Sequence, residues 1–207
     1  MSVKKFIVNN CMKYIKKNTN HDDIKLKEIE YGLVSIYLSI SKFIFISLVA
    51  LFLGIFKEMI IFTLLFNIIR LPAFGLHATK SWICLLSSTF LFIMVPILCI
   101  YLNLNNFSIV FICLVCMLLI LKNAPADTYK RPIVSKKRRT IYKILSTVIA
   151  IVFSISAIII NDNFLSNCFV FALILENILI SPTTYKIFKL PYNNYITFLK
   201  EHPNFEK

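Results

Sequence analysis

The chain has very little glycine and little charge for its length. Only 3 of its 207 residues are glycine, which excludes the glycine-rich phosphate loops of P-loop and Rossmann proteins. Charged residues make up 16% of the sequence and hydrophobic residues 58%, whereas a soluble domain is about a quarter charged. The mean hydropathy is +0.76. Because the apolar runs are continuous, unlike the alternating strands of a β-barrel, the sequence predicts an all-α polytopic integral membrane protein.

The six cysteines show no metal-binding pattern. Cys113 and Cys116 form a CxxC, but the pair lies inside an apolar run with no second pair and no acid. Packing within the membrane explains that pair, and a reduced, cytoplasm-facing setting disfavours a disulfide framework. We therefore expect no metal and no cofactor. The net charge of +13 does not indicate nucleic-acid binding, because the basic residues flank apolar runs.

Hydropathy predicts about six transmembrane helices behind a basic N-terminal region. Residues 1–33 carry seven lysines and an apolar face at helical spacing, which favours an amphipathic helix on the inner leaflet. Residues 34–180 form the expected transmembrane domain, and residues 181–207 form a cytoplasmic tail. The expected spans cover residues 34–54, about 55–69, 81–102, 107–121, 144–160 and 164–180. The second run is short for a span, so a re-entrant segment over residues 55–80 stays open.

The basic residues also predict the orientation of the spans. Residues 122–143 contain eight basic residues and a single acid, Asp127. Three turns are expected on the opposite side, at residues 55–58, 103–106 and 161–163, and they contain one lysine and no arginine. Since cytoplasmic loops are enriched in Lys and Arg, we expect both termini, the basic loop 122–143 and the segment 70–84 at the cytoplasmic face of the cell membrane.

The 70–84 segment is the best candidate for an active site. It is a polar interruption between two apolar runs, and it contains an imidazole, His77, and a thiol, Cys84. In one straight helix these two residues would stand about 10.5 Å apart along the axis, which is too far for a Cys–His pair. His77 must therefore lie on a non-helical stretch that folds back, as Pro72 and Gly75 permit. Cys84 would lie one turn into the next helix, whose N-terminus favours a thiolate.

The same segment resembles the signature of the AgrB family, the membrane peptidases of bacterial quorum sensing. The shared pattern is Arg-x4-Gly-x-His-Ala-x5-Cys, carried here by Arg70, Gly75, His77, Ala78 and Cys84. Residues 123–132 also resemble that family's inner-loop motif, and the length and span order are similar over essentially the whole chain. Leu71 and Pro72 depart from the pattern of many members, and these departures concern substrate fit more than chemistry.

The resemblance implies a cysteine endopeptidase that removes the C-terminal part of a short amphipathic, AgrD-like precursor peptide. It also implies cyclisation of the product to a thiolactone or lactone through an acyl-thioester on Cys84. In this scheme Cys84 is the nucleophile and His77 is the general base and then the general acid. The resemblance further implies a homodimer in the lipid bilayer, although no small-xxx-small interface motif stands out.

Supporting roles at this site have more than one interpretation. Arg70 either binds the carboxylates of the precursor or shapes the loop, and it can equally be a positive-inside anchor. Asp127 either orients His77, binds precursor charge or makes a local turn. The remaining candidates for binding or support are Gly75, Lys130 and Arg131.

Two other functional classes stay open. A small transporter would use the intramembrane charges Glu176 and Lys42 for coupling, and a noncatalytic membrane partner would need neither. Replacement of Cys84 separates the peptidase from the other two classes, because only the peptidase depends on its thiol.

Overall fold

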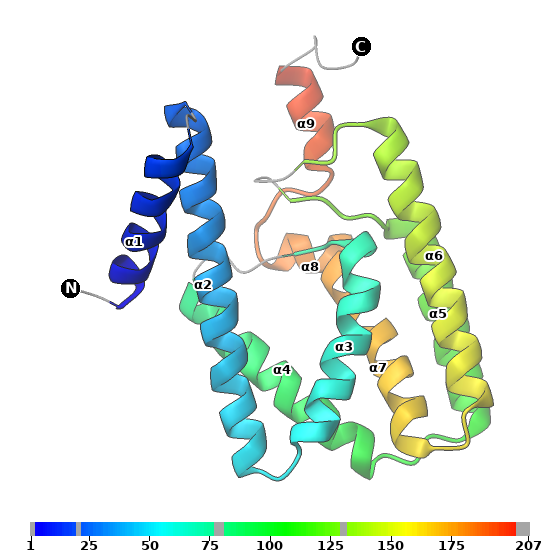
Figure 1. Ribbon diagram of the computed structural model, residues 1–207. Coiled ribbons are helices and arrows are strands. Elements are labelled where there is room, and N and C mark those ends of the chain that lie inside the picture. The colour runs from blue at the N-terminus through cyan, green and yellow to red at the C-terminus, as the bar shows by residue number, and fades with distance from the viewer. Residues whose placement is uncertain (1–2, 20–21, 77–80, 129–131, 202–207) are drawn as a thin grey trace. The chain divides into compact units, whose positions relative to one another are not determined.

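The structure is a computed structural model that describes residues 3–19, 22–76, 81–128 and 132–201 (Figure 1). These residues form nine helices, with no strand among them, which confirms the predicted all-α fold. Five of the described helices are long and apolar enough to cross a membrane, close to the predicted count of about six. The chain divides into two compact units, residues 1–53 and residues 54–207, and each is described by itself.

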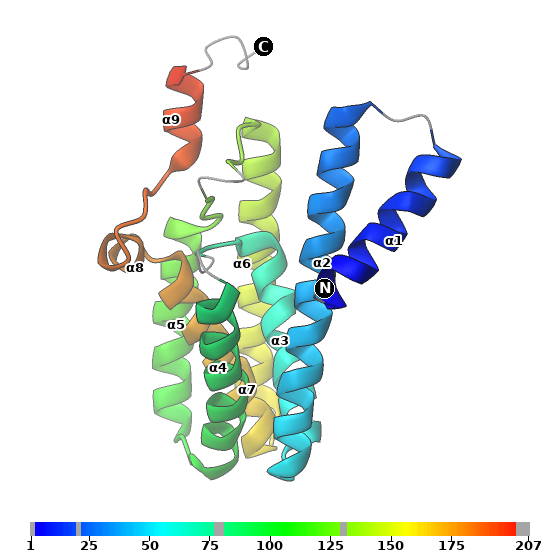
Figure 2. The same ribbon diagram turned by 90° about the vertical axis from the view of Figure 1, so that its left-hand side faces the viewer.

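The first unit pairs an amphipathic helix with a long apolar one (Figure 2). Helix α1 (Val3–Asn18) packs on α2 (Asp23–Phe52) and leaves Phe6 and Ile7 exposed, as expected of a helix that lies on a membrane surface. The carboxylate of Asp22 accepts the backbone N–H of Lys25 and so caps the start of α2. α2 contains most of the first expected span and continues on its N-terminal side without a break.

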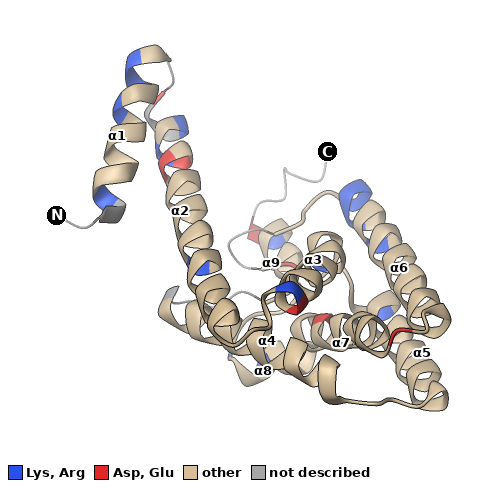
Figure 3. Ribbon diagram, turned by 60° about the horizontal axis from the view of Figure 1, so that its bottom comes forward, with Lys and Arg blue, Asp and Glu red and all other residues tan. Residues whose placement is uncertain are grey.

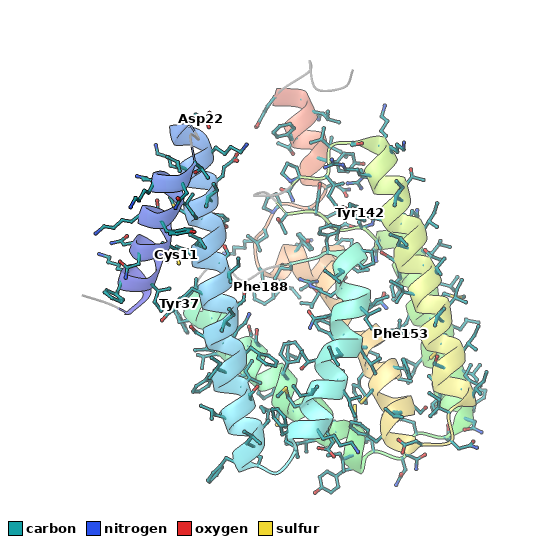
Figure 4. All side chains as sticks on the ribbon, in the orientation of Figure 1. Cys11, Asp22, Tyr37, Tyr142, Phe153 and Phe188 are labelled. Carbon is teal, nitrogen blue, oxygen red and sulfur yellow. The ribbon has the colours of Figure 1, made fainter. Side chains whose placement is uncertain are left out.

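The second unit is a helical bundle with α7 (Asn163–Ile180) at its centre (Figure 1). The four helices that pack against α7 are α3 (Phe56–Ala73), α4 (Ser81–Tyr101), α5 (Asn106–Asn123) and α6 (Lys136–Ile159). Half of the α7 span is buried inside the protein, against 22% for each of the spans in α4, α5 and α6. Phe153 points from α6 toward α7, where its ring meets that of Phe169 edge-on at 5.0 Å between centroids (Figure 4).

Polar residues make the turns at the end of the bundle away from the 70–84 segment, as the sequence predicts. Asn105 accepts the N–H of Ser108 at 2.8 Å and caps α5. Asp162 accepts the N–H of Leu165 at the same distance of 2.8 Å and caps α7. The first backbone N–H groups of a helix have no acceptor within the helix, and these two side chains supply one.

Helix α3 differs most from the hydropathy profile. It extends beyond the apolar run to Ala73 and includes Pro72 in its last turn. It contains three charged residues, Lys57, Glu58 and Arg70, within 18 residues, and it is not among the five described helices that qualify as spans by length and composition. Its central part is nevertheless buried, because it packs against α4, α6 and α7.

The C-terminal tail forms two further helices, which the sequence analysis did not predict. Helix α8 (Pro182–Ile187) is capped by Ser181 and has Pro182 at its first position, and α9 (Asn194–Glu201) follows after a short connection. Serine followed by proline is a common helix start. That local signal could have indicated α8.

A buried amide joins α7 to the end of α4. Asn167 is 1% exposed, and its Nδ2 donates to the carbonyl oxygens of Cys99 at 3.0 Å and Leu102 at 2.6 Å. The last carbonyls of a helix have no partner within the helix, and no water reaches them in the apolar interior of a membrane protein. Asn167 therefore satisfies the C-terminal end of α4.

We expect Asn167→Ala to lower the free energy of unfolding by about 1–2 kcal/mol, since it removes two buried hydrogen bonds. The matched control is Asn163→Ala, which removes only an exposed contact to Asn103, and it should change stability by less than about 0.5 kcal/mol. Unfolding of the purified protein in mixed detergent micelles measures both. Equal effects of the two substitutions would show that the α4 end does not depend on Asn167.

Candidate functional site

The 70–84 segment begins where α3 ends. Ala73 is the last helical residue, and Phe74 and Gly75 follow with φ angles of 63° and 94°. Residues 74–76 are therefore not helical, as predicted for the stretch that leads to His77. Helix α4 then starts at Ser81, which places the half-buried Cys84 in its first turn.

The segment between the end of α3 at Ala73 and the start of α4 at Ser81 is called the connection. Three backbone hydrogen bonds hold the start of the connection against two other parts of the bundle. The N–H of Gly75 donates to the carbonyl of Ala126 at 2.8 Å, and the N–H of Ala126 donates to Ala73 at 3.0 Å. The N–H of Leu76 donates to the carbonyl of Leu179 near the end of α7 at 3.0 Å. The chain is thus fixed at the residue directly before His77.

An ion pair fixes the same connection from inside the bundle. Arg70 Nη1 lies 3.4 Å from Oε1 of Glu176, which is fully buried, and Nη2 donates to the carbonyl oxygen of Leu76 at 2.6 Å. A carboxylate within a membrane helix is costly unless it has a partner, and Arg70 is that partner. The arginine also acts on the loop, because its second nitrogen holds Leu76.

Gly75 is required at this point by conformation and by space. Its φ of 94° is strained for any residue with a side chain. A Cβ at this position would lie 2.5 Å from Arg70 Nη1 and 2.8 Å from the carbonyl oxygen of Leu179. The second contact is with backbone, so it cannot be relieved by a change of rotamer.

Asp127 lies in the basic loop and is 3% exposed. Its carboxylate accepts the backbone N–H groups of Asn194 at 3.0 Å and Tyr195 at 2.9 Å, and it faces Arg139 at 3.6 Å. Its backbone carbonyl accepts the Tyr185 hydroxyl at 3.0 Å, and burial raises the pKa of Tyr185, which keeps that donor protonated. Asp127 therefore docks α9 on the loop, and an orienting role toward His77 stays a prediction.

The structure brings some predicted site residues together and leaves others undescribed. Arg70 and Gly75 meet beside the carbonyl of Leu76. His77, Lys130 and Arg131 lie outside the described residues, so their predicted roles stay predictions. Sequence reasoning missed the docking of α9 on Asp127, and the signal that could have indicated it is a lone acid in a strongly basic loop.

An apolar cavity adjoins the connection. It measures about 530 Å³, and its walls include Phe74, Ile133, Tyr142 and Phe198. Tyr142 lies on the first turns of α6 (Figure 4), and its ring meets that of Phe74 edge-on at 4.9 Å between centroids. Arg138 supplies a positive charge to the same wall. Such a cavity suits an apolar side chain with an acidic group nearby.

The family model for accessory gene regulator B matches residues 8–180, which include all of the 70–84 segment and the basic loop. The chain belongs to the accessory gene regulator B family. An AgrB-like protein of Clostridium acetobutylicum is 32% identical over 184 residues, which cover 89% of this chain and 88% of that protein. Accessory gene regulator protein B of Staphylococcus aureus strain MW2 is 32% identical over 142 residues, which cover 67% of this chain and 76% of that protein. No solved structure matches this AgrB-family chain.

Gly54 and Gly32 allow the effect of the positive φ at Gly75 to be separated from the effect of steric crowding there. Gly75→Ala should lower the free energy of unfolding by about 3 kcal/mol, because it adds crowding to an unfavourable φ. Gly54 has a φ of 70° but open space where a Cβ would lie, so Gly54→Ala should cost only about 1 kcal/mol. Gly32→Ala, within α2 and also with open space around it, should be neutral or stabilising.

Unfolding of the three variants in the same detergent measures these differences. If Gly75→Ala costs no more than Gly54→Ala, the close approach of Arg70 and Leu179 does not constrain residue 75.

Proposed function

We propose that this protein is a membrane-embedded cysteine endopeptidase that cleaves the C-terminal part from a short autoinducer precursor peptide. The observation that carries the proposal is the fixed start of the connection between α3 and α4. Cys84 lies in the first turn of α4, and His77 directly follows Leu76, whose amide and carbonyl are both hydrogen-bonded. The chain is thus held at the residue before His77, and this fixed start supports the proposed Cys–His pair.

In the proposed reaction, His77 takes the proton of the Cys84 thiol. The thiolate attacks the carbonyl carbon of the scissile peptide bond, the C–N bond breaks, and the leaving amine takes the proton from the imidazolium. The N-terminal part of the precursor is then an acyl-thioester on Cys84. A thiol of the same precursor attacks that carbonyl, which forms a thiolactone and restores the Cys84 thiol; a hydroxyl would give a lactone.

Exclusion of water favours this transfer over hydrolysis, because a thioester can react with either nucleophile. The apolar walls around Phe74 and Tyr142 provide such a setting beside the connection. The same cavity would take an apolar residue of the amphipathic precursor, with Arg138 beside it for an acidic group.

We further propose that both termini and the site face the cytoplasm. In the second unit, the C-terminal ends of α3, α5 and α7 and the basic start of α6 lie at one end of the bundle (Figure 1). This end carries the basic loop, and cytoplasmic loops are rich in Lys and Arg. The proposed partners are the AgrD-like precursor, the lipid bilayer and a second copy of the chain.

Co-expression with the short amphipathic precursor tests the chemistry. Wild-type protein should shorten the tagged precursor at its C-terminal side, whereas Cys84→Ala, Cys84→Ser and His77→Ala should leave it intact, because each lacks an effective nucleophile or base. Cys11→Ala, at an exposed cysteine on α1, is the matched control and should process normally. Gels and mass spectrometry follow precursor size, and immunoblots of membranes follow protein abundance.

An intact precursor with wild-type protein present in membranes would contradict the peptidase and favour a noncatalytic membrane partner. Normal processing by Cys84→Ala would also contradict it.

Glu176 should act as a positioning residue, since it reaches the connection only through Arg70. Glu176→Gln keeps the shape but removes the charge, and we expect processing to slow by about tenfold to a hundredfold, as a misplaced reacting group would cause. Glu58→Gln, at the first turn of α3, is the control and should process at the wild-type rate.

Initial rates at increasing precursor concentration distinguish positioning from lost binding. A fall in the maximal rate with an unchanged half-saturating concentration is expected. Wild-type kinetics of Glu176→Gln would show that the ion pair does not set the position of His77.

A further inference from the structure

A second cavity lies on the other side of the start of α6, and its wall is basic. It measures about 530 Å³ and is bounded by the end of α5, the first two turns of α6 and the connection that leads to α9. The cationic residues in its wall are Lys122, Arg139 and Lys143, and no carboxylate is among the described residues that line it. Figure 3 shows the concentration of Lys and Arg at the start of α6.

Two of these three charges have no counter-ion within the described part of the chain. Arg139 faces Asp127 at 3.6 Å and lies over the ring of Tyr195 at 3.5 Å from its centroid. Lys122 and Lys143 are exposed and have no ion pair among the described residues. The cavity therefore has excess positive charge, which attracts an anionic group.

Neutral hydrogen-bond donors complete the wall. The side chains of Thr140, Tyr192 and Tyr195 all line the cavity. The hydroxyls of Thr140 and Tyr192 already donate to the carbonyl oxygens of Lys136 at 3.1 Å and Asn123 at 3.5 Å, so of these three the hydroxyl of Tyr195 remains to donate to a ligand. Hydroxyls and cations together are the usual partners of a phosphate or carboxylate oxygen.

The position of the cavity along the bundle distinguishes a lipid from a soluble ligand. Lys122 follows the last apolar turn of α5, and Lys143 precedes the apolar part of α6. These are the points at which the two spans meet the membrane surface, where lipid phosphates lie.

Exposed apolar rows run from the cavity along both helices. Ile144 belongs to the cavity wall and starts a row on α6 that continues at helical spacing through Val148, Ile151 and Ile155, all of them exposed. Lys122 ends the corresponding row on α5, formed by Phe111, Val115 and Leu118. A basic cavity that continues into two lipid-facing rows has the shape of a headgroup site with room for acyl chains.

We propose that this basic cavity binds the phosphate headgroup of an anionic phospholipid, with the acyl chains along α5 and α6. Lys122 and Lys143 contact the phosphate oxygens, and the hydroxyl of Tyr195 donates a hydrogen bond. Cys84 is not among the described residues that line the cavity, and the lipid proposal does not depend on the proposed peptidase activity.

Native mass spectrometry of the full-length protein tests this site, with dioleoyl-phosphatidylglycerol or dioleoyl-phosphatidylcholine added to detergent micelles. We expect clear preference for phosphatidylglycerol. Lys122→Gln/Lys143→Gln should weaken its binding by about 30-fold, because two cations near a lipid phosphate are removed. Lys137→Gln/Lys186→Gln removes the same charge from positions outside the cavity and should keep the wild-type preference.

Equal binding of the two lipids, or unchanged preference in the Lys122/Lys143 variant, would overturn the proposal. A hexaglutamate peptide is added in a separate arm. If the peptide binds in a Lys122- and Lys143-dependent way while phosphatidylglycerol does not, the cavity is a peptide site and the lipid assignment is wrong. Inorganic phosphate that binds as tightly as phosphatidylglycerol would likewise overturn the lipid assignment.

Discussion

The contact between Arg70 and Glu176 is the constraint on which the site depends. Glu176 is fully buried in the central helix, where an uncompensated carboxylate would be expensive. Because the arginine that compensates it also binds the carbonyl of Leu76, the ion pair ties the end of α3, the end of α7 and the connection to one another. Removal of Arg70 would leave the Glu176 carboxylate buried without this partner, and the cost of that state exceeds the net gain from the pair. The geometry of the connection is thus coupled to the packing of the bundle.

This coupling explains how a segment without regular secondary structure can have a fixed conformation directly before the proposed catalytic residue His77. Residues 74–76 are hydrogen-bonded to three other parts of the chain, which are the loop at Ala126, the helix end at Leu179 and the side chain of Arg70. Gly75 is the point where they converge, and only a residue without a side chain allows so close an approach. The connection therefore gains from tertiary contacts the rigidity that a helix gains from its own hydrogen bonds. Such rigidity before binding is what a nucleophile–base pair needs in order to act without reorganisation.

Local features of the structure could be predicted from the sequence, whereas contacts between distant residues could not. Hydropathy located the spans, and Asn105 and Asp162 marked the turns, because caps and apolar runs depend on neighbouring residues. Helix geometry also required a non-helical stretch before Cys84. A carboxylate at position 176, inside an apolar run, indicates the need for a partner, but nothing local selects Arg70, which lies 106 positions away. The docking of Asn194 and Tyr195 on Asp127 could not be predicted for the same reason, because these residues lie 67 and 68 positions from Asp127 in the sequence.

The start of α6 separates two environments that suit different ligands. Arg138 faces the apolar cavity beside Phe74, and its neighbour Arg139 faces the basic cavity, because consecutive residues of a helix point in directions about 100° apart. Asp127 holds Arg139 and the start of α9 together, and so it keeps the wall of the basic cavity in place. An apolar peptide and an anionic headgroup could therefore be bound at the same end of the bundle without competition for the same charges. Because both cavities share α6, a lipid that fixes the start of this helix would also fix Tyr142, and through its ring contact Phe74 at the beginning of the connection.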